Sequence, residues 1–157
     1  MSAITFVQKH MLTRSVALGL LLVLVAVGFA DTIYLAVKAV TGGPVVCNVV
    51  EGCGIVLESK WATIGGIPTA FYGLGFYGLL AVFAVAYTIW RDHQLLLLMA
   101  LVSSIGVIVS AFFVYLQLFV IGAICAYCML SAVITTAIFG LVWTLVYHDR
   151  YHHRISS

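Results

Sequence analysis

The chain has 157 residues, of which 64% are hydrophobic and 8% are charged, and its formal net charge is +2. Soluble domains carry about 25% charged residues, so this composition excludes an ordinary soluble enzyme and indicates a single membrane domain, residues 1–157. The small net charge says little about partners. We expect membrane lipid around the protein and no nucleic-acid partner.

Hydropathy predicts an all-α protein, an integral membrane bundle of four transmembrane helices. A helix needs about 20 apolar residues to cross a bilayer. Residues 94–147 contain no Asp, Glu, Lys or Arg, which is room for two spans. The four predicted spans are residues 15–40, 68–89, 95–117 and 123–146. A long loop, residues 41–67, joins the first span to the second.

The first span holds the one acidic residue predicted to lie within the membrane, Asp31. Ionisable groups inside a membrane are functional candidates by default. The favoured interpretation is nevertheless an ion pair with Lys38, seven residues further along the same helix face and near its outer end. A second question is whether residues 20–30 form a signal-peptide core. The apolar run continues past Asp31, so we expect an uncleaved helix.

The long loop carries the first cysteine pair, Cys47 and Cys53, among several glycines and a proline. Such a composition is typical of a mobile segment with turns. Apolar residues from Ile55 onwards predict a short amphipathic piece on the membrane surface or over the mouth of the bundle. Taken alone, the pair could equally form a structural Cys47–Cys53 disulfide.

The fourth span begins with the second pair, Cys125 and Cys128, in the sequence GAICAYCML. Residues three apart in a regular helix have Cβ atoms about 5–6 Å apart, whereas a disulfide needs about 3.8 Å. The pair can therefore close only where helical geometry is relaxed, as in a first turn. A helix N-terminus also favours a thiolate. The alternative is simple packing of two small apolar side chains.

A stripe of small residues continues from this pair down the fourth span. Cys128, Ala132, Thr136 and Gly140 recur every four residues. We expect the stripe to pack against a neighbouring helix, as small residues do in membranes.

The distribution of positive charge predicts the orientation of the chain. Cytoplasmic segments carry an excess of Lys and Arg. Two such residues, Lys38 and Lys60, lie on one side of the predicted spans. The five on the other side are Lys9, Arg14, Arg91, Arg150 and Arg154. The protein is therefore expected in the plasma membrane with both termini in the cytoplasm. All four cysteines then lie on the outer or periplasmic side, where disulfides persist.

A mobile cysteine pair above a pair at a helix start is the arrangement that a thiol relay needs, because exchange requires a thiolate to reach a disulfide sulfur. Zinc is the alternative use of four cysteines. Structural zinc sites prefer close pairs such as C-x2–4-C, and one pair here is C-x5-C, so we expect no metal. A membrane scaffold with structural cysteines is the non-enzymatic alternative.

The ordered motifs resemble the vitamin K epoxide reductase family in its prokaryotic form, without a fused thioredoxin-like domain. The match comprises Cys47 and Cys53, then Ser59-Lys60-Trp61, then GGIPTAFYGLGFY at residues 65–77, then Cys125-Ala-Tyr-Cys128. It extends over about residues 15–146. Another bacterial quinone-linked disulfide oxidase is also a four-helix bundle with two cysteine pairs. It resembles this chain less, because its C-x-x-C lies in the first outer segment.

The resemblance implies a redox-active membrane oxidoreductase that passes electrons from a thioredoxin-like dithiol protein to a quinone. Cys47 would exchange with that partner, which is expected to be a separate protein. Cys53 would exchange with Cys125, and Cys128 would face the quinone. The acceptor would be of the menaquinone, ubiquinone or vitamin K type.

The quinone pocket is predicted with less detail. Ser59 matches a loop serine implicated near the quinone in the family. Thr69 stands where the animal enzymes have an asparagine, and the aromatic wall candidates are Phe112, Phe113 and Tyr115. Ala132 stands where the animal enzymes have a tyrosine, which argues against epoxide reduction. Reduction of vitamin K epoxide or quinone proper remains the alternative.

Overall fold

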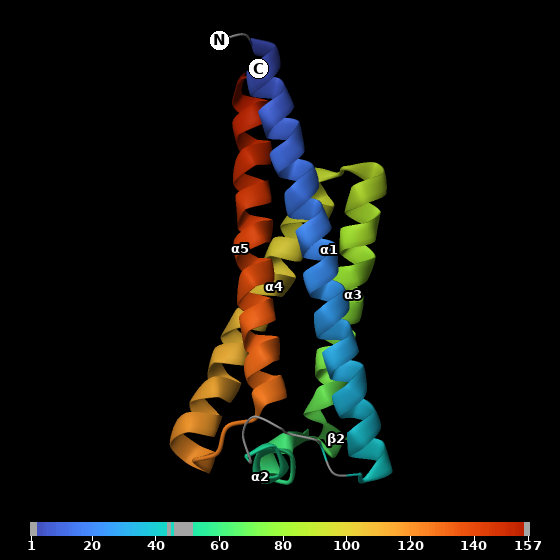
Figure 1. Cartoon of the computed structure of the whole chain (residues 1–157), viewed down its shortest axis with the longest axis vertical. Helices are drawn as coiled ribbons and strands as arrows, with labels where there is room; N and C mark the ends of the chain where they lie inside the picture. The colour runs from blue at the N-terminus through green and yellow to red at the C-terminus, as the bar shows by residue number, and fades with distance from the viewer. Residues whose placement is uncertain (1–2, 44, 46–51, 156–157) are drawn as a thin grey trace.

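Four long helices dominate the computed structural model, which describes residues 3–43, 45 and 52–155 and the side chains between residues 14 and 150 within those ranges. They are α1 (Ala3–Thr41), α3 (Thr69–Trp90), α4 (His93–Tyr115) and α5 (Ala126–Ile155). Both termini lie at one end of the bundle, and the loop elements lie at the other (Figure 1).

All four helices are long and apolar enough to cross a membrane. The apolar segments are Arg14–Thr41, Thr69–Trp90, His93–Ile121 and Ala126–Arg150. Their outward faces carry many exposed Leu, Ile, Val and Phe side chains, a surface suited to lipid rather than water. The predicted all-α, four-helix membrane bundle is thereby confirmed, and the chain is a multi-pass membrane protein.

The helices form a closed ring. α1 packs against α3 and α5, and α4 packs against the same two helices. Tyr77 of α3 lies at the centre and is 1% exposed. Its hydroxyl is 3.0 Å from the hydroxyl oxygens of both Ser131 and Thr135 of α5. A Cβ atom on Gly28 of α1 would lie 2.2 Å from the Tyr77 ring, so this glycine allows α1 and α3 to approach closely.

The stripe of small residues on α5 does not form the packing face that its four-residue spacing predicts. Thr136 and Gly140 are exposed, whereas Ile134, Ile138 and Val142 are at most 4% exposed. The α-helical repeat is 3.6 residues, so a strict four-residue stripe turns gradually around the helix. The stripe therefore turns away from the core towards the C-terminal part of α5.

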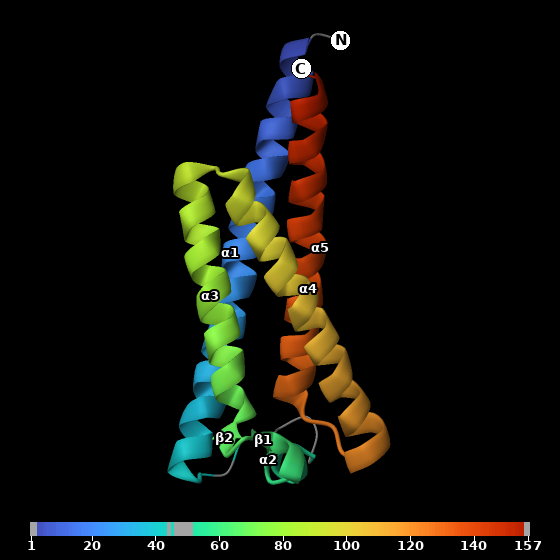
Figure 2. The same cartoon turned by 180° about the vertical axis from the view of Figure 1, so that it is seen from behind.

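The long loop folds into small elements beneath the open end of the bundle (Figure 2). They are α2 (Cys53–Leu57), η1 (Lys60–Ala62), β1 (Thr63–Ile64) and β2 (Ile67–Pro68), with the two strands paired antiparallel. The sequence predicted the short piece over the bundle mouth but not the β ribbon. Its turn uses Gly65 and Gly66, whose φ angles of 61° and 81° are readily adopted by glycine.

Candidate redox site

Cys125 occupies the N-terminal cap of α5. Its Sγ accepts a hydrogen bond from the backbone N–H of Cys128 at 3.4 Å, and its carbonyl oxygen accepts from Met129 N–H at 3.0 Å. A cap side chain normally bonds the N–H three residues on in this way. The C-x-x-C therefore lies at the relaxed helix start that the sequence predicted, with Cys125 just before the first turn.

The approach to this cap is shaped by the end of α4. The helix widens into a π-helical stretch, η2 (Leu116–Ile121), and Gly122 then turns the chain with a φ of 70°. Gln117, only 2% exposed, accepts a hydrogen bond from the Cys125 N–H through its Oε1 at 2.8 Å. One buried amide thus fixes the backbone of the first cysteine, a role that sequence reasoning missed.

Cys125 and Cys128 are free thiols, whereas Cys53 is disulfide-bonded. Cys47, its predicted partner in the loop, lies outside the described residues. The hydrogen bond with the Cys128 thiol, aided by the backbone N–H groups of Cys128 and Tyr127, lowers the pKa of Cys125 to about 7. Burial and the Asp31 carboxylate oppose this shift. Cys125 is therefore partly thiolate at neutral pH, the nucleophilic form of the residue.

The loop brings Cys53 into the same buried cluster as this thiol. Cys53 and Cys125 are 1% and 0% exposed, and they share one buried apolar cluster with Val56. The contact is permitted by Gly52, because a Cβ atom there would lie 2.6 Å from the carbonyl oxygen of Ile124. The structure thus brings together two of the three described cysteines that the sequence placed in the site, with Cys128 at the edge of the cluster.

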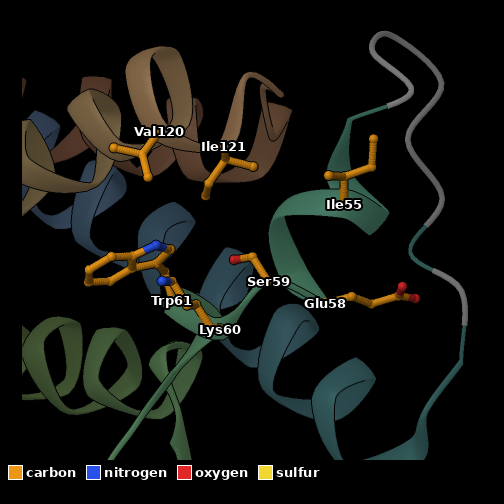
Figure 3. A pocket seen from close by; sticks show the side chains of 7 residues that line it. All are labelled: Ile55, Glu58, Ser59, Lys60, Trp61, Val120 and Ile121. Carbon is orange, nitrogen blue, oxygen red and sulfur yellow. The ribbon is translucent and has the colours of Figure 1, made fainter.

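A groove runs beside the cluster, between the loop and η2 (Figure 3). Its lining combines apolar side chains of η2 and α2 with the Ser59-Lys60-Trp61 sequence. The Ser59 hydroxyl donates to the Val56 carbonyl oxygen at 2.7 Å. The Lys60 ammonium lies 5.3 Å from the centre of the Trp61 ring. Ile121 belongs to both the groove and the cysteine cluster, so the two are contiguous.

The other predicted quinone residues are dispersed. Thr69 is the first residue of α3. Phe112 is 51% exposed and contacts Trp61 and Phe113, with ring centroids 6.5 Å and 5.9 Å away. Tyr115 is 54% exposed and lies 5.1 Å from the Phe119 ring. Phe112 therefore joins the neighbourhood of the groove, whereas Tyr115 packs along η2. Their binding of quinone stays a prediction.

Asp31 does not form the ion pair with Lys38 that the sequence favoured. The ion pairs among the described residues involve Asp149, and the Lys38 ammonium instead lies 5.8 Å from the centre of the Tyr34 ring. Asp31 is 8% exposed and points into the bundle. Seven residues raise a helix by about 10 Å, so Lys38 reaches towards the outer end while Asp31 stays below it.

Comparison with known proteins gives the site its context. The model of the Vitamin K epoxide reductase family matches residues 19–143, which include the Cys53 helix and the C-x-x-C. The chain belongs to the vitamin K epoxide reductase family. The expected resemblance is therefore confirmed.

A curated relative of this family member is the thiol-disulfide oxidoreductase LTO1 of Arabidopsis thaliana. The two are 29% identical over 120 residues, which cover 71% of this chain and 32% of the relative. The chain thus spans about a third of the length of that relative.

Among the residues described here, no three His, Cys, Asp or Glu side chains gather as metal ligands.

Proposed function

We propose that this protein is a membrane thiol–disulfide oxidoreductase that oxidises a thioredoxin-like dithiol protein and reduces a quinone. One observation carries the proposal. A disulfide-bonded loop cysteine, Cys53, lies in the same buried cluster as the free thiol of Cys125. Family membership and the similarity to a thiol-disulfide oxidoreductase support the same reaction class.

The proposed cycle begins with both cysteine pairs reduced, after a partner dithiol has given two electrons to the loop disulfide. Cys125 and Cys128 give two electrons and two protons to the quinone, which becomes a hydroquinone, and they form a disulfide. A Cys53 thiolate then attacks Cys125 Sγ and releases Cys128. Cys47 attacks Cys53 and releases Cys125, so that the loop disulfide is restored. The partner dithiol finally reduces the loop disulfide through Cys47 and is itself oxidised.

The thiol chemistry of Cys125 suits this sequence. A thiol of lower pKa is the better leaving group in disulfide exchange, and the pKa of Cys125 is lowered to about 7. Its release from a Cys53–Cys125 mixed disulfide is therefore favoured. Cys128 is only half-buried, which leaves the second sulfur more accessible to an electron acceptor than the first.

The orientation is part of the proposal. Both chain termini and the turn between α3 and α4 lie towards one end of the bundle, while the loop helix α2 lies at the other (Figure 1). Arg91 belongs to that turn and Arg14 pairs with Asp149 of α5, whereas Cys53 begins α2. We place the basic end in the cytoplasm by the positive-inside rule. A fluorescent protein fused after residue 157 should fluoresce, and alkaline phosphatase fused there should be inactive. The reverse pattern would invert the orientation.

The direct test mixes purified protein, a reduced thioredoxin-fold protein and a soluble short-chain quinone, and follows quinone absorbance. Wild-type protein should turn over. Cys128→Ser should abolish quinone reduction, and Cys47→Ser should block oxidation of the protein dithiol while sparing small thiols. Quinone reduction that persists in folded Cys128→Ser would contradict the proposed route.

A trapping experiment tests the exchange geometry without quinone. The double variant Cys47→Ser/Cys128→Ser keeps Cys53 and Cys125 and should accumulate a disulfide between them under mild oxidation. The matched control Cys53→Ser/Cys125→Ser keeps the other two sulfurs and should cross-link far less. Mass spectrometry of proteolytic fragments identifies the linked peptides. Equal cross-linking in both variants would argue against a Cys53–Cys125 step.

A further inference from the structure

Asp31 lies on the face of α1 that meets α5, the helix that begins at the C-x-x-C. Three residues before it, Gly28 is against Tyr77, whose hydroxyl reaches Ser131 of α5. Three residues after it, the Tyr34 ring lies 5.1 Å from the Tyr127 ring of α5. Residues three apart share a helix face. Asp31 is therefore bracketed between these two contacts, level with the first turns of α5.

One oxygen of the Asp31 carboxyl group is buried without a partner. The residue is 8% exposed, and its Oδ2 atom is the one buried side-chain oxygen or nitrogen without a hydrogen-bond partner among the described residues. Burying an unbonded polar group is costly, and each such group in a protein calls for an explanation. Neither an ion pair nor a hydrogen bond to this oxygen within the described chain supplies one here.

The groups that face Asp31 are titratable. Its carboxylate interacts electrostatically with both thiols of the C-x-x-C, Cys125 and Cys128. It also interacts with the phenols of Tyr77 on α3 and Tyr127 on α5. The Tyr77 hydroxyl is already engaged by side chains of α5. Asp31 is thus a buried carboxylate within electrostatic range of the thiols that the proposed reaction must deprotonate.

We propose that Asp31 takes up the proton released by the Cys125–Cys128 dithiol and returns it to the quinone oxygen. The inference rests on the proposed function. Two S–H bonds break, one S–S bond forms and two O–H bonds form, while two electrons pass from sulfur to quinone. The reactive form of a cysteine is the thiolate, so one proton must leave sulfur before the quinone can accept it. Asp31 holds that proton and ends the cycle unchanged.

The test uses Asp31→Asn, which keeps the size of the side chain but cannot carry the proton. Reduced protein is mixed with excess short-chain benzoquinone, and a single oxidation of the dithiol is followed. General acid–base groups typically contribute about 10²–10⁴-fold in rate, so the variant should be at least about 100-fold slower. Asp31→Glu should recover part of the rate. Asp92→Asn, a matched change at the opposite end of the bundle, should react like wild type.

An infrared measurement gives a readout that does not depend on comparing rates. A time-resolved difference spectrum, recorded while reduced wild-type protein reacts with the quinone, should contain a transient carbonyl band of a protonated carboxylic acid. That band should shift on ¹³C-aspartate labelling in wild type but not in Asp31→Glu. This comparison holds even if Asp31→Asn fails to fold, and a missing or label-insensitive band in wild type would overturn the proposal.

The kinetic outcomes separate this inference from the proposed function. Wild-type rates in folded Asp31→Asn, together with an inactive Cys128→Ser, would overturn the role of Asp31 and leave the relay standing. Quinone reduction by Cys128→Ser would instead overturn the relay. A slow Asp31→Asn that is not improved by Asp31→Glu, without the infrared band, would assign Asp31 a structural role only.

Discussion

At the scale of single residues, the cap position of Cys125 predicts how its thiol titrates. Its pKa is lowered to about 7, mainly by the Cys128 thiol. In reduced protein, the ultraviolet absorbance of the thiolate should therefore rise with a midpoint near this pH, and the nucleophile is lost as pH falls below it. Cys128→Ala removes this hydrogen-bond donor, so its midpoint should lie higher. An identical midpoint in the variant would contradict this assignment.

Gly52 offers a second test at this scale. The Cβ atom of an alanine at this position would lie 2.6 Å and 2.8 Å from backbone atoms of Ile124, and backbone cannot move aside as a side chain can. Gly52→Ala should therefore separate the loop from the C-x-x-C and lower the yield of the trapped Cys53–Cys125 disulfide by about tenfold, equivalent to about 1.4 kcal/mol.

Gly54→Ala is the matched control, because nothing lies within 4 Å of its added Cβ. It should trap the disulfide as well as the parent variant does. Equal losses in both variants would indicate a general effect on the loop rather than the close approach of Gly52 to Ile124.

The residues of the site were predictable to different degrees. Hydropathy and the turn at Gly122 placed Cys125 and Cys128 at a helix start, which agrees with the local geometric requirement of a C-x-x-C. The role of Gln117 depends on how η2 and Gly122 turn the chain back, which no local pattern encodes. Asp31 was recognised as unusual, but its pairing was misjudged because helix spacing does not tell which way a long lysine side chain turns.

At the scale of elements, the contact between α1 and α3 depends on Gly28. An added Cβ would lie 2.2 Å from the Tyr77 ring, and overfilling a packed interior typically costs about 1–3 kcal/mol. Gly28→Ala should lower the free energy of unfolding by that amount, measured by thermal or denaturant unfolding in detergent.

Gly19→Ala is the control on the same helix, since its Cβ would meet nothing within 4 Å. Alanine is favoured over glycine in a helix interior by roughly 0.5–1 kcal/mol, so this variant should be as stable as wild type or slightly more so. Destabilisation of both variants by the same amount would refute the close packing of Tyr77.

The long helices were predictable, whereas among the short loop elements only the amphipathic piece over the bundle mouth was. Runs of about 20 apolar residues specify transmembrane helices almost without regard to context. The two-residue strands β1 and β2 have no comparable signal, because each is very short and depends on pairing with the other. The prediction that the small-residue stripe on α5 forms a packing face was wrong for a related reason. Residues spaced by four share a helix face over one or two turns, but not over a whole span.

At the scale of the whole molecule, α1 and α5 extend beyond the turn that joins α3 to α4 (Figure 2). A polar cluster lies at this end, opposite the cysteines. The Arg14 guanidinium donates to the Tyr87 hydroxyl and lies 3.6 Å from the Asp149 carboxylate. The His93 Nδ1 atom is 2.6 Å from the same carboxylate. These four side chains come from α1, α3, α4 and α5, so the cluster links every helix of the ring.

Asp149→Asn should therefore weaken the assembly of the bundle without affecting its chemistry. Hydrogen bonds to charged groups contribute about 1.5–3 kcal/mol, and solvent reaches part of this cluster, so a loss of about 1–2 kcal/mol in unfolding free energy is expected. Asp92→Asn should stay within about 0.5 kcal/mol of wild type, because Asn caps a helix as well as Asp does.

The same two variants then separate stability from redox chemistry. Because the cluster and the C-x-x-C lie at opposite ends of the bundle, folded Asp149→Asn should oxidise its dithiol at the wild-type rate at temperatures well below unfolding. A slowed reaction in fully folded Asp149→Asn would mean that the two ends are coupled through the helices. Unchanged stability would mean that apolar packing alone holds the four helices together at this end.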